Sequence, residues 1–303
     1  MERRKLIIKG FQLCCFFVFA GRAWQHIMWD APFRTILWDE SLLSGIIPAI
    51  TGMTWNEYAT SPVVDGAINN LKVSIGVLYA LLAIFSLFAH KRSLEKARGL
   101  LLIGSGLLFC LSLLYFKEKF YQVGQLMEYS IQFGSPLFLY YALKPTINEQ
   151  RLMLLMKVAI AITFTCHGLY ALGYYPQPGH FVGMTLRILG VDETTARLLL
   201  KCFGWADVVL SILIFIPKTA RWALLYAALW GFATAIARIW ANIHLDFLLP
   251  SLNQWTFETV MRLPHGLVPL LLIYPLQAYF KLPSKNTHDN VFSLSKKYTE
   301  HAH

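Results

Sequence analysis

The sequence predicts an all-α integral membrane protein with eight transmembrane helices. Hydrophobic residues fill 56% of the 303 positions, and charged residues fill only 15%. A soluble domain of this composition would expose large apolar patches, which soluble monomers avoid. The apolar residues also form long runs and lack the two-residue alternation of barrel strands. These observations exclude a soluble enzyme and favour helical spans joined by short loops.

Eight apolar runs are long enough to cross a bilayer, which takes roughly 20 residues each. They lie at about 7–27, 71–89, 99–116, 122–143, 152–174, 198–217, 220–241 and 263–280. The first run follows the basic stretch MERRK, as a signal peptide would. We interpret it as a span because it has a counterpart in the second half. Residues 282–303 hold few apolar side chains and predict a disordered cytoplasmic tail.

The distribution of lysine and arginine predicts the orientation. If the N-terminus is cytoplasmic, the inside segments hold sixteen of these residues and the outside loops hold five. Because cytoplasmic loops carry the excess of positive charge, both termini are expected in the cytoplasm, with the protein in a bacterial inner membrane. The net charge of +10 then reflects topology. The expected partner is the lipid bilayer, and no nucleic acid is expected.

The outside connections are longer than the cytoplasmic turns. They cover about 28–70, 175–197 and 242–262. Long loops commonly carry function. Within the first connection, residues 42–55 (LLSGIIPAITGMTW) are too few to span and too apolar for water. This segment is expected to lie in the membrane interface or to re-enter the membrane.

The two halves of the chain resemble each other. Residues 135–143 (SPLFLYYAL) and 268–276 (VPLLLIYPL) share Pro, Leu and Tyr positions at a constant offset of 133. Residues 17–27 (FVFAGRAWQHI) and 162–172 (ITFTCHGLYAL) each precede a Pro and a Phe, and the third and seventh runs each follow a basic turn, which ends at Arg98 or Arg221. Since four helices is an even number, the halves are parallel repeats. The predicted domains are 1–145, with its long loop 28–70, then 146–281, and the tail 282–303.

The second half resembles the DoxX-like four-helix membrane module. The resemblance rests on TFTCHGLYALGYYPQPGHFVGMTLRILGV, then LLLKCFGWADVVLSILIF and a short basic turn. It covers about 152–280 and, more weakly, 7–143. Relatives in that clan include DoxD-type subunits of quinone-linked thiosulfate oxidation, DoxX-type partners of redox complexes and, more distantly, the vitamin K-dependent carboxylase membrane domain. The resemblance implies quinone as a cofactor and another redox or membrane subunit as a partner. The chain has no CxxC motif, so it departs from the branch that performs thiol chemistry.

Polar residues inside the apolar runs mark the candidate site, because such residues are costly in a membrane and usually functional. All of them fall in the outer half of the bilayer or near its middle, which predicts an outward-facing pocket. Those expected to act in catalysis are His167, Asp207 and Glu128, and those expected to bind a ligand are Arg22, His26, Gln132, Arg238 and His265. No metal is expected, because the histidines lack the spacing of a helical ligand pair.

Several interpretations of these residues remain open. Arg22 and Arg238 could pair with Glu128 and Asp207 as buried ion pairs that only hold helices together. As a redox subunit, the protein would bind a quinone ring beside His167 and Asp207, where groups that titrate near neutral pH transfer protons. The alternatives are a non-catalytic scaffold or assembly subunit and a small-solute carrier. The sequence predicts no interrupted helix, which speaks against the carrier.

Overall fold

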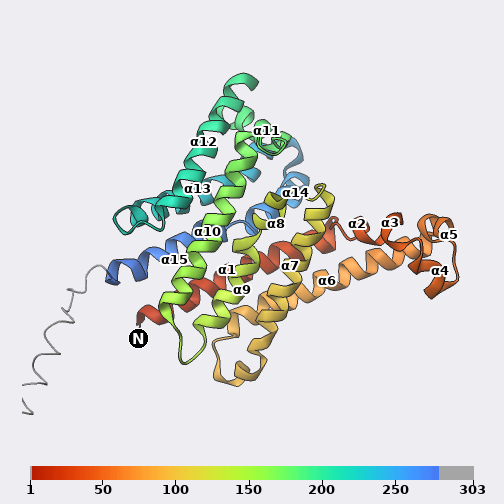
Figure 1. Cartoon of the computed structure of the whole chain (residues 1–303), viewed down its shortest axis with the longest axis horizontal. Coiled ribbons are helices and arrows are strands. Elements are labelled where there is room, and N and C mark those ends of the chain that lie inside the picture. Colours follow the sequence, from red (N-terminus) through yellow and green to blue (C-terminus); the bar gives the residue numbers. More distant parts are fainter. Residues whose placement is uncertain (1, 280–303) are drawn as a thin grey trace, which may run out of the picture.

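The computed structural model describes residues 2–279, and every regular element in that range is a helix (Figure 1). The long helices are α1 (Glu2–Met28), α6 (Pro62–Phe88), α7 (Leu100–Glu118), α9 (Ser130–Ala142), α10 (Glu149–Leu172), α12 (Glu193–Leu213), α13 (Pro217–Asn242), α14 (Leu248–Val260) and α15 (Pro264–Tyr279). The shorter ones are α2 (Arg34–Leu37), α3 (Glu40–Leu43), α4 (Ile46–Thr51), α5 (Trp55–Thr60), η1 (Arg92–Gly99), α8 (Val123–Met127), α11 (Gly179–Leu189) and η2 (Leu245–Phe247). The predicted all-α class is confirmed.

Five helices are long and apolar enough to cross a membrane. They are α1, α6, α7 with the preceding η1, α10 and α13. The chain is therefore an integral membrane protein by the length and composition of these helices. The other three predicted runs correspond to α12, α9 and α15. Helix α12 has 21 residues but carries four charged side chains, whereas α9 has 13 residues and α15 has 16 in the described range.

The fourth predicted run is interrupted. Residues 122–143 form two helices, α8 and α9, which are separated at Glu128 and Tyr129. A second interruption separates α14 from α15 at Met261–Leu263. Met261 lies 133 positions after Glu128, so the two interruptions fall at equivalent places in the predicted repeats. The expectation of an uninterrupted helix is wrong for 122–143. The second interruption falls where the predicted connection 242–262 meets the predicted helix 263–280, and the helix α14 within that connection was not expected.

The two halves use the same pairs of helix contacts. Helix α1 packs along α6 and α10 packs along α12, while α7 packs on α9 and α13 packs on α15. Helices α9 and α15 each contact both α1 and α10, and they also contact each other. The central core lies where these four helices meet. It contains Phe11, Val18, Phe138, Leu139, Ile160 and Leu272.

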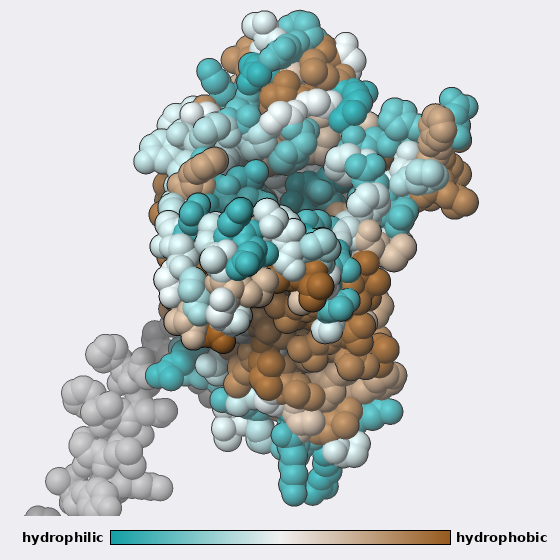
Figure 2. All heavy atoms as spheres, turned by 90° about the vertical axis from the view of Figure 1, so that its right-hand side faces the viewer, coloured by the Kyte–Doolittle hydropathy of each residue, from teal (hydrophilic) through white to brown (hydrophobic). Residues whose placement is uncertain are grey.

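The connections divide between two ends of the molecule. Figure 1 shows the N-terminus, the α6–α7, α9–α10 and α12–α13 connections and the end of α15 along the left and lower edges. Helices α2–α5, α11 and α14 lie toward the right and top. At the first end, Arg4 donates to the Lys144 carbonyl and Arg98 donates to the Leu143 carbonyl. Figure 2 shows an apolar band with hydrophilic side chains above and below it, as a membrane protein requires.

Helices α3–α5, which include the predicted interfacial segment, project beyond the bundle at the end of α6 (Figure 1). Leu42, Ile46 and Ile50 are exposed on this projection. Asp39 caps α3 by accepting a hydrogen bond from the Leu42 amide and forms an ion pair with Lys117 of α7. Hydrogen bonds from Lys117 and Ser41 lower the pKa of Asp39 to about 2. This contact holds the start of the projection against the bundle.

Candidate functional site

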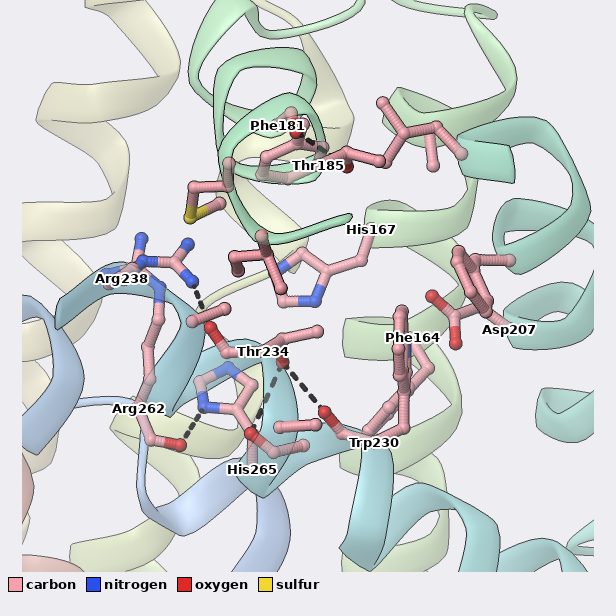
Figure 3. Close-up of a pocket in the computed structure, with 18 of the residues that line it drawn as sticks. Phe164, His167, Phe181, Thr185, Asp207, Trp230, Thr234, Arg238, Arg262 and His265 are labelled. Carbon is pink, nitrogen blue, oxygen red and sulfur yellow. Dashed lines mark hydrogen bonds between the residues drawn. The ribbon is translucent and has the colours of Figure 1, made fainter. Parts of the chain in front are cut away.

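A cavity of about 260 Å³ lies in the second half, between α10, α12 and α13 and beneath α11 (Figure 3). Its walls are mainly apolar and include the rings of Phe164, Phe181 and Phe203. Ile188 and Leu189, at the end of α11, line the cavity and are 37% and 51% exposed. The cavity wall therefore reaches the surface of the protein beside α11.

Helix α11 is fixed by its ends. It follows the extended residue Pro178, and it stops at Gly190, whose φ of 64° is a left-handed conformation that favours glycine. Val182 and Met184 are buried, while His180 and Arg187 are exposed, so the helix is amphipathic. Such a helix lies naturally in the plane of a membrane interface. Here its apolar face closes the cavity.

One end of the cavity is basic. Arg238 Nε donates to Glu258 Oε2 at 3.0 Å, and Arg238 Nη1 donates to the Thr234 carbonyl at 2.8 Å. Arg262 reaches the same Glu258 oxygen at 3.3 Å, so two guanidinium groups share one carboxylate. The rings of His167 and His265 stack with their centroids 5.6 Å apart. This end therefore offers several hydrogen-bond donors and a surplus of positive charge.

Asp207 lies on the opposite side of the cavity from Arg238 (Figure 3). Its residue surface is only 4% exposed, and Oδ1 has no hydrogen-bond partner among the described residues. A buried polar atom without a partner is uncommon and costs about 1–3 kcal/mol. Asp207 thus lines an apolar cavity and holds one buried carboxyl oxygen, Oδ1, without a hydrogen-bond partner among residues 2–279.

Glu128 reaches the site from the first half of the chain. Its carboxylate lies 3.5 Å from His167 Nε2 and accepts a hydrogen bond of 2.7 Å from Gln125. The interruption between α8 and α9 places Glu128 at this position, next to α10. Glu128 does not line the cavity itself, but it contacts a histidine that does.

The structure separates the other predicted residues from this cavity. Arg22, His26 and Gln132 belong to a cluster in the first half. Gln132 Oε1 accepts hydrogen bonds from Arg22 Nε at 3.2 Å and Nη2 at 2.7 Å, and Gln25 Oε1 accepts one from Nη1 at 2.7 Å. His26 Nδ1 lies 2.7 Å from the Arg22 carbonyl, and its ring meets the Tyr79 ring edge-on at 5.1 Å.

The ion pairs considered from the sequence do not form in the described chain. Arg238 pairs with Glu258, whereas Arg22 bonds only neutral amide groups. Glu128 contacts His167, and Asp207 has no ion-pair partner in the range 2–279. Hydropathy predicts which spans carry these residues. It does not predict how each helix is rotated about its axis, and this rotation decides which side chains form ion pairs.

Sequence reasoning missed Glu258 and Arg262. Both lie in or just after α14, within a stretch that was interpreted as an outside loop. Their i, i+4 spacing is a signal of a helical ion pair, and Arg262 stands 133 positions after Tyr129 at the first interruption. Burial by itself raises the pKa of Glu258. The guanidinium groups of Arg262 and Arg238 together lower this pKa by more than burial raises it, so the net shift is downward.

Among residues 2–279, no group of three or more His, Cys, Asp or Glu side chains could hold a metal ion. Cys14, Cys15 and Cys166 are buried free thiols, and Cys110 and Cys202 are exposed ones. The side chains around the cavity offer hydrogen bonds and positive charge from Arg, and proton transfer by His, Asp and Glu. No protein-family model, curated protein or solved structure matches the chain.

Proposed function

We propose that the chain crosses a bacterial inner membrane eight times, as two parallel four-helix repeats with both termini in the cytoplasm. Three observations support this. The contact pairs of α1, α6, α7 and α9 repeat in α10, α12, α13 and α15. The interruptions are equivalent, and the basic turns gather at one end. We also propose that the second half is a DoxX-like four-helix module, as its sequence suggests. The tail 282–303 lies outside the described residues.

We further propose that the cavity binds the ring of a quinone and that the protein is a quinone-linked redox subunit. A quinone ring is flat and largely apolar, with a carbonyl oxygen at each of two opposite edges. The aromatic walls suit its faces. Arg238 or His265 would donate to one oxygen, and a protonated Asp207 carboxyl would donate to the other. The lipid-soluble tail would leave beside Ile188 and Leu189, where the cavity wall reaches the surface.

Proton transfer is the chemistry that this chain would supply. Reduction of a quinone to a quinol takes up two electrons and two protons, and the reverse reaction releases them. The electrons would be exchanged with a redox partner subunit. His167 faces the cavity and Glu128 stands 3.5 Å behind its Nε2 atom, so this pair could pass a proton to or from the ring oxygen. Asp207 would serve the other oxygen.

The observation that carries the proposal is the carboxyl of Asp207, a residue that lines the apolar cavity and whose Oδ1 atom has no hydrogen-bond partner in the described chain. A helix-packing role alone gives no reason to keep a buried carboxyl in that position. A ligand with an acceptor atom at that edge does give one.

The test is a titration of the purified protein in nanodiscs with short-tailed menaquinone and ubiquinone analogues. We expect saturable binding that is lost in Ala237→Trp, because Ala237 lines the cavity. Ile236→Trp is the matched control, since Ile236 is the preceding residue of α13 and is exposed. Lack of saturable binding by the unmodified protein would contradict the quinone proposal. Equal loss in both variants would show that the cavity is not the site.

A small-solute carrier is the second candidate. The interruptions of α8–α9 and α14–α15 favour it, because transporters build substrate sites at interrupted helices. Uptake of a radiolabelled organic anion into proteoliposomes, without quinone binding, would favour the carrier. A protein that neither binds quinone nor moves solute, yet co-purifies with another membrane subunit, would instead fit the scaffold.

A further inference from the structure

The predicted repeats pair four residues of the first half with four residues of the second. The first and fifth helices correspond at an offset of 145, the fourth and eighth at 133, and the third and seventh at 123 when counted from Arg98 and Arg221. The resulting pairs are Arg22 with His167, Tyr115 with Arg238, Tyr129 with Arg262, and Gln132 with His265.

These pairs converge in space in both halves. In the second half, all four members line the cavity. In the first half, all four members contact one another around one guanidinium group. The Arg22 guanidinium carbon lies 4.9 Å from the centre of the Tyr129 ring and 5.6 Å from that of Tyr115, and Gln132 accepts two hydrogen bonds from it. The Arg22 side chain thus occupies the first-half counterpart of the cavity.

The surroundings of Arg22 are those of a cation-binding site. Arg22 is 0% exposed, and within residues 2–279 it forms no ion pair with a carboxylate. A buried charge is costly unless it is compensated. Here the compensation comes from two aromatic faces and from three hydrogen bonds to the amide oxygens of Gln132 and Gln25. Aromatic faces and neutral acceptors are the groups that recognise a cation without neutralising it.

We propose that Arg22 is a tethered ligand in a closed cation-binding chamber and that this chamber binds a free guanidinium ion once the arginine side chain is removed. The chamber is lined by Tyr115, Tyr129, Gln132 and Gln25. The two predicted repeats then carry equivalent sites that differ in what occupies them. The first is filled by its own arginine, and the second stays open to an outside ligand. This inference does not depend on what the second site binds.

The test is chemical rescue of Arg22→Ala with methylguanidinium chloride. We expect the variant to have a lower Tm than the unmodified protein and to regain it, with saturation, as methylguanidinium is added. Methylammonium should bind about tenfold more weakly, because it lacks the planar fork of donors that matches Gln132 and Gln25. The unmodified protein should show no shift beyond that of an equal concentration of sodium chloride.

Two variants serve as controls. Arg22→Met fills the chamber with an uncharged chain of similar length, so methylguanidinium should leave its Tm unchanged. Arg34→Ala removes a partly exposed arginine that lies 5.0 Å from the Trp38 ring, and it should not be rescued either. Absence of saturable rescue in Arg22→Ala, or equal rescue in Arg34→Ala, overturns the proposal. Failure of Arg22→Ala to fold even with methylguanidinium overturns it as well, because the free ion then cannot replace the tethered one.

Discussion

Asp207 and Arg22 are both buried and both lack an ion-pair partner in the described chain, yet their surroundings differ. The Arg22 guanidinium donates hydrogen bonds to amide oxygens, and aromatic rings lie against it. Asp207 lines a cavity, and its buried Oδ1 atom has no hydrogen-bond partner among the described residues. The first arrangement stabilises the folded structure, whereas the second leaves one carboxyl oxygen without a partner. Substitution of the two residues should therefore have opposite consequences for stability.

Asp207→Leu removes the donor and keeps a branched side chain, so it should weaken binding of the quinone analogue about tenfold, which corresponds to about 1.4 kcal/mol, a typical value for one hydrogen bond. Its Tm should stay equal or rise, because the leucine replaces a costly buried carboxyl with an apolar side chain. Asp192→Ala, at the N-cap of the same helix, is the control. Asp192 accepts a hydrogen bond from the Thr195 amide, so its loss should lower Tm without changing ligand binding. Unchanged binding in Asp207→Leu would remove Asp207 from the site.

Glu258→Gln should lower the free energy of unfolding by on the order of 2 kcal/mol, because Arg238 and Arg262 would lose their shared carboxylate. The effect should stay below the about 3–5 kcal/mol of a fully buried pair, since the Glu258 side chain is 27% exposed. Thermal denaturation in detergent measures it. Glu193→Gln, which affects an exposed pair with Arg197, should change Tm little.

The same carboxylate predicts a pH dependence. The pKa of Glu258 is lower in the folded protein than its ordinary value of 4.5. Its contribution to stability is therefore present above pH 4.5 and is lost as the pH falls from there through the lowered folded pKa. The unmodified protein should lose Tm over that window by more than Glu258→Gln does. Parallel pH profiles for the two proteins would show that Glu258 does not contribute in this way.

At the scale of elements, the sequence predicted the long helices better than their interruptions. Most of the apolar runs give the helix ends within about five residues, but α6 begins at Pro62, well before its run at 71–89, and the run 122–143 contains two helices. The interruption at Glu128 lies inside the predicted run 122–143, and hydropathy alone does not show where one helix ends and the next begins. The residues around the interruption make tertiary contacts, which a local sequence pattern does not predict. Glu128 contacts His167, and the Gly124 amide donates to the Tyr175 hydroxyl.

Close packing of α10 against α12 leads to a prediction at this scale. A Cβ atom added at Gly204 would lie 2.8 Å from the Gly168 carbonyl oxygen, which is backbone and cannot move aside easily. Gly204→Ala should therefore destabilise the protein by about 1–3 kcal/mol, the usual range for overpacking. Gly106→Ala in α7 is the matched control, because nothing lies within 4 Å of the added atom. Its Tm should be unchanged or slightly higher, since alanine favours a helix. Equal Tm values for the two variants would contradict this account.

At the scale of the whole molecule, composition and charge were sufficient for the class of protein but not for the division of the site. The rule that polar groups inside spans are functional selected His167, Asp207, Arg238 and His265, which line one cavity. It also selected Arg22 and Gln132, which close a separate cluster in the other half. A repeat predicts two equivalent sites, and only the side chains placed in each decide which one stays open.

The orientation of the bundle follows from the same whole-molecule pattern and can be tested by labelling with a membrane-impermeant maleimide. Asn56 is exposed in α5 on the expected outer side, and Ser93 is exposed in η1 among the basic residues of the expected cytoplasmic turn. The background should carry alanine at Cys110 and Cys202, because both thiols are exposed. We expect Asn56→Cys to react in intact cells and Ser93→Cys to react only after the membrane is opened. We expect this because η1 and its neighbours carry Lys91, Arg92, Lys96 and Arg98, and a loop with this many positive charges is disfavoured on the outer side of the membrane. If Ser93→Cys reacts in intact cells and Asn56→Cys does not, the orientation is the opposite of the expected one. The mouth of the cavity would then lie on the cytoplasmic side.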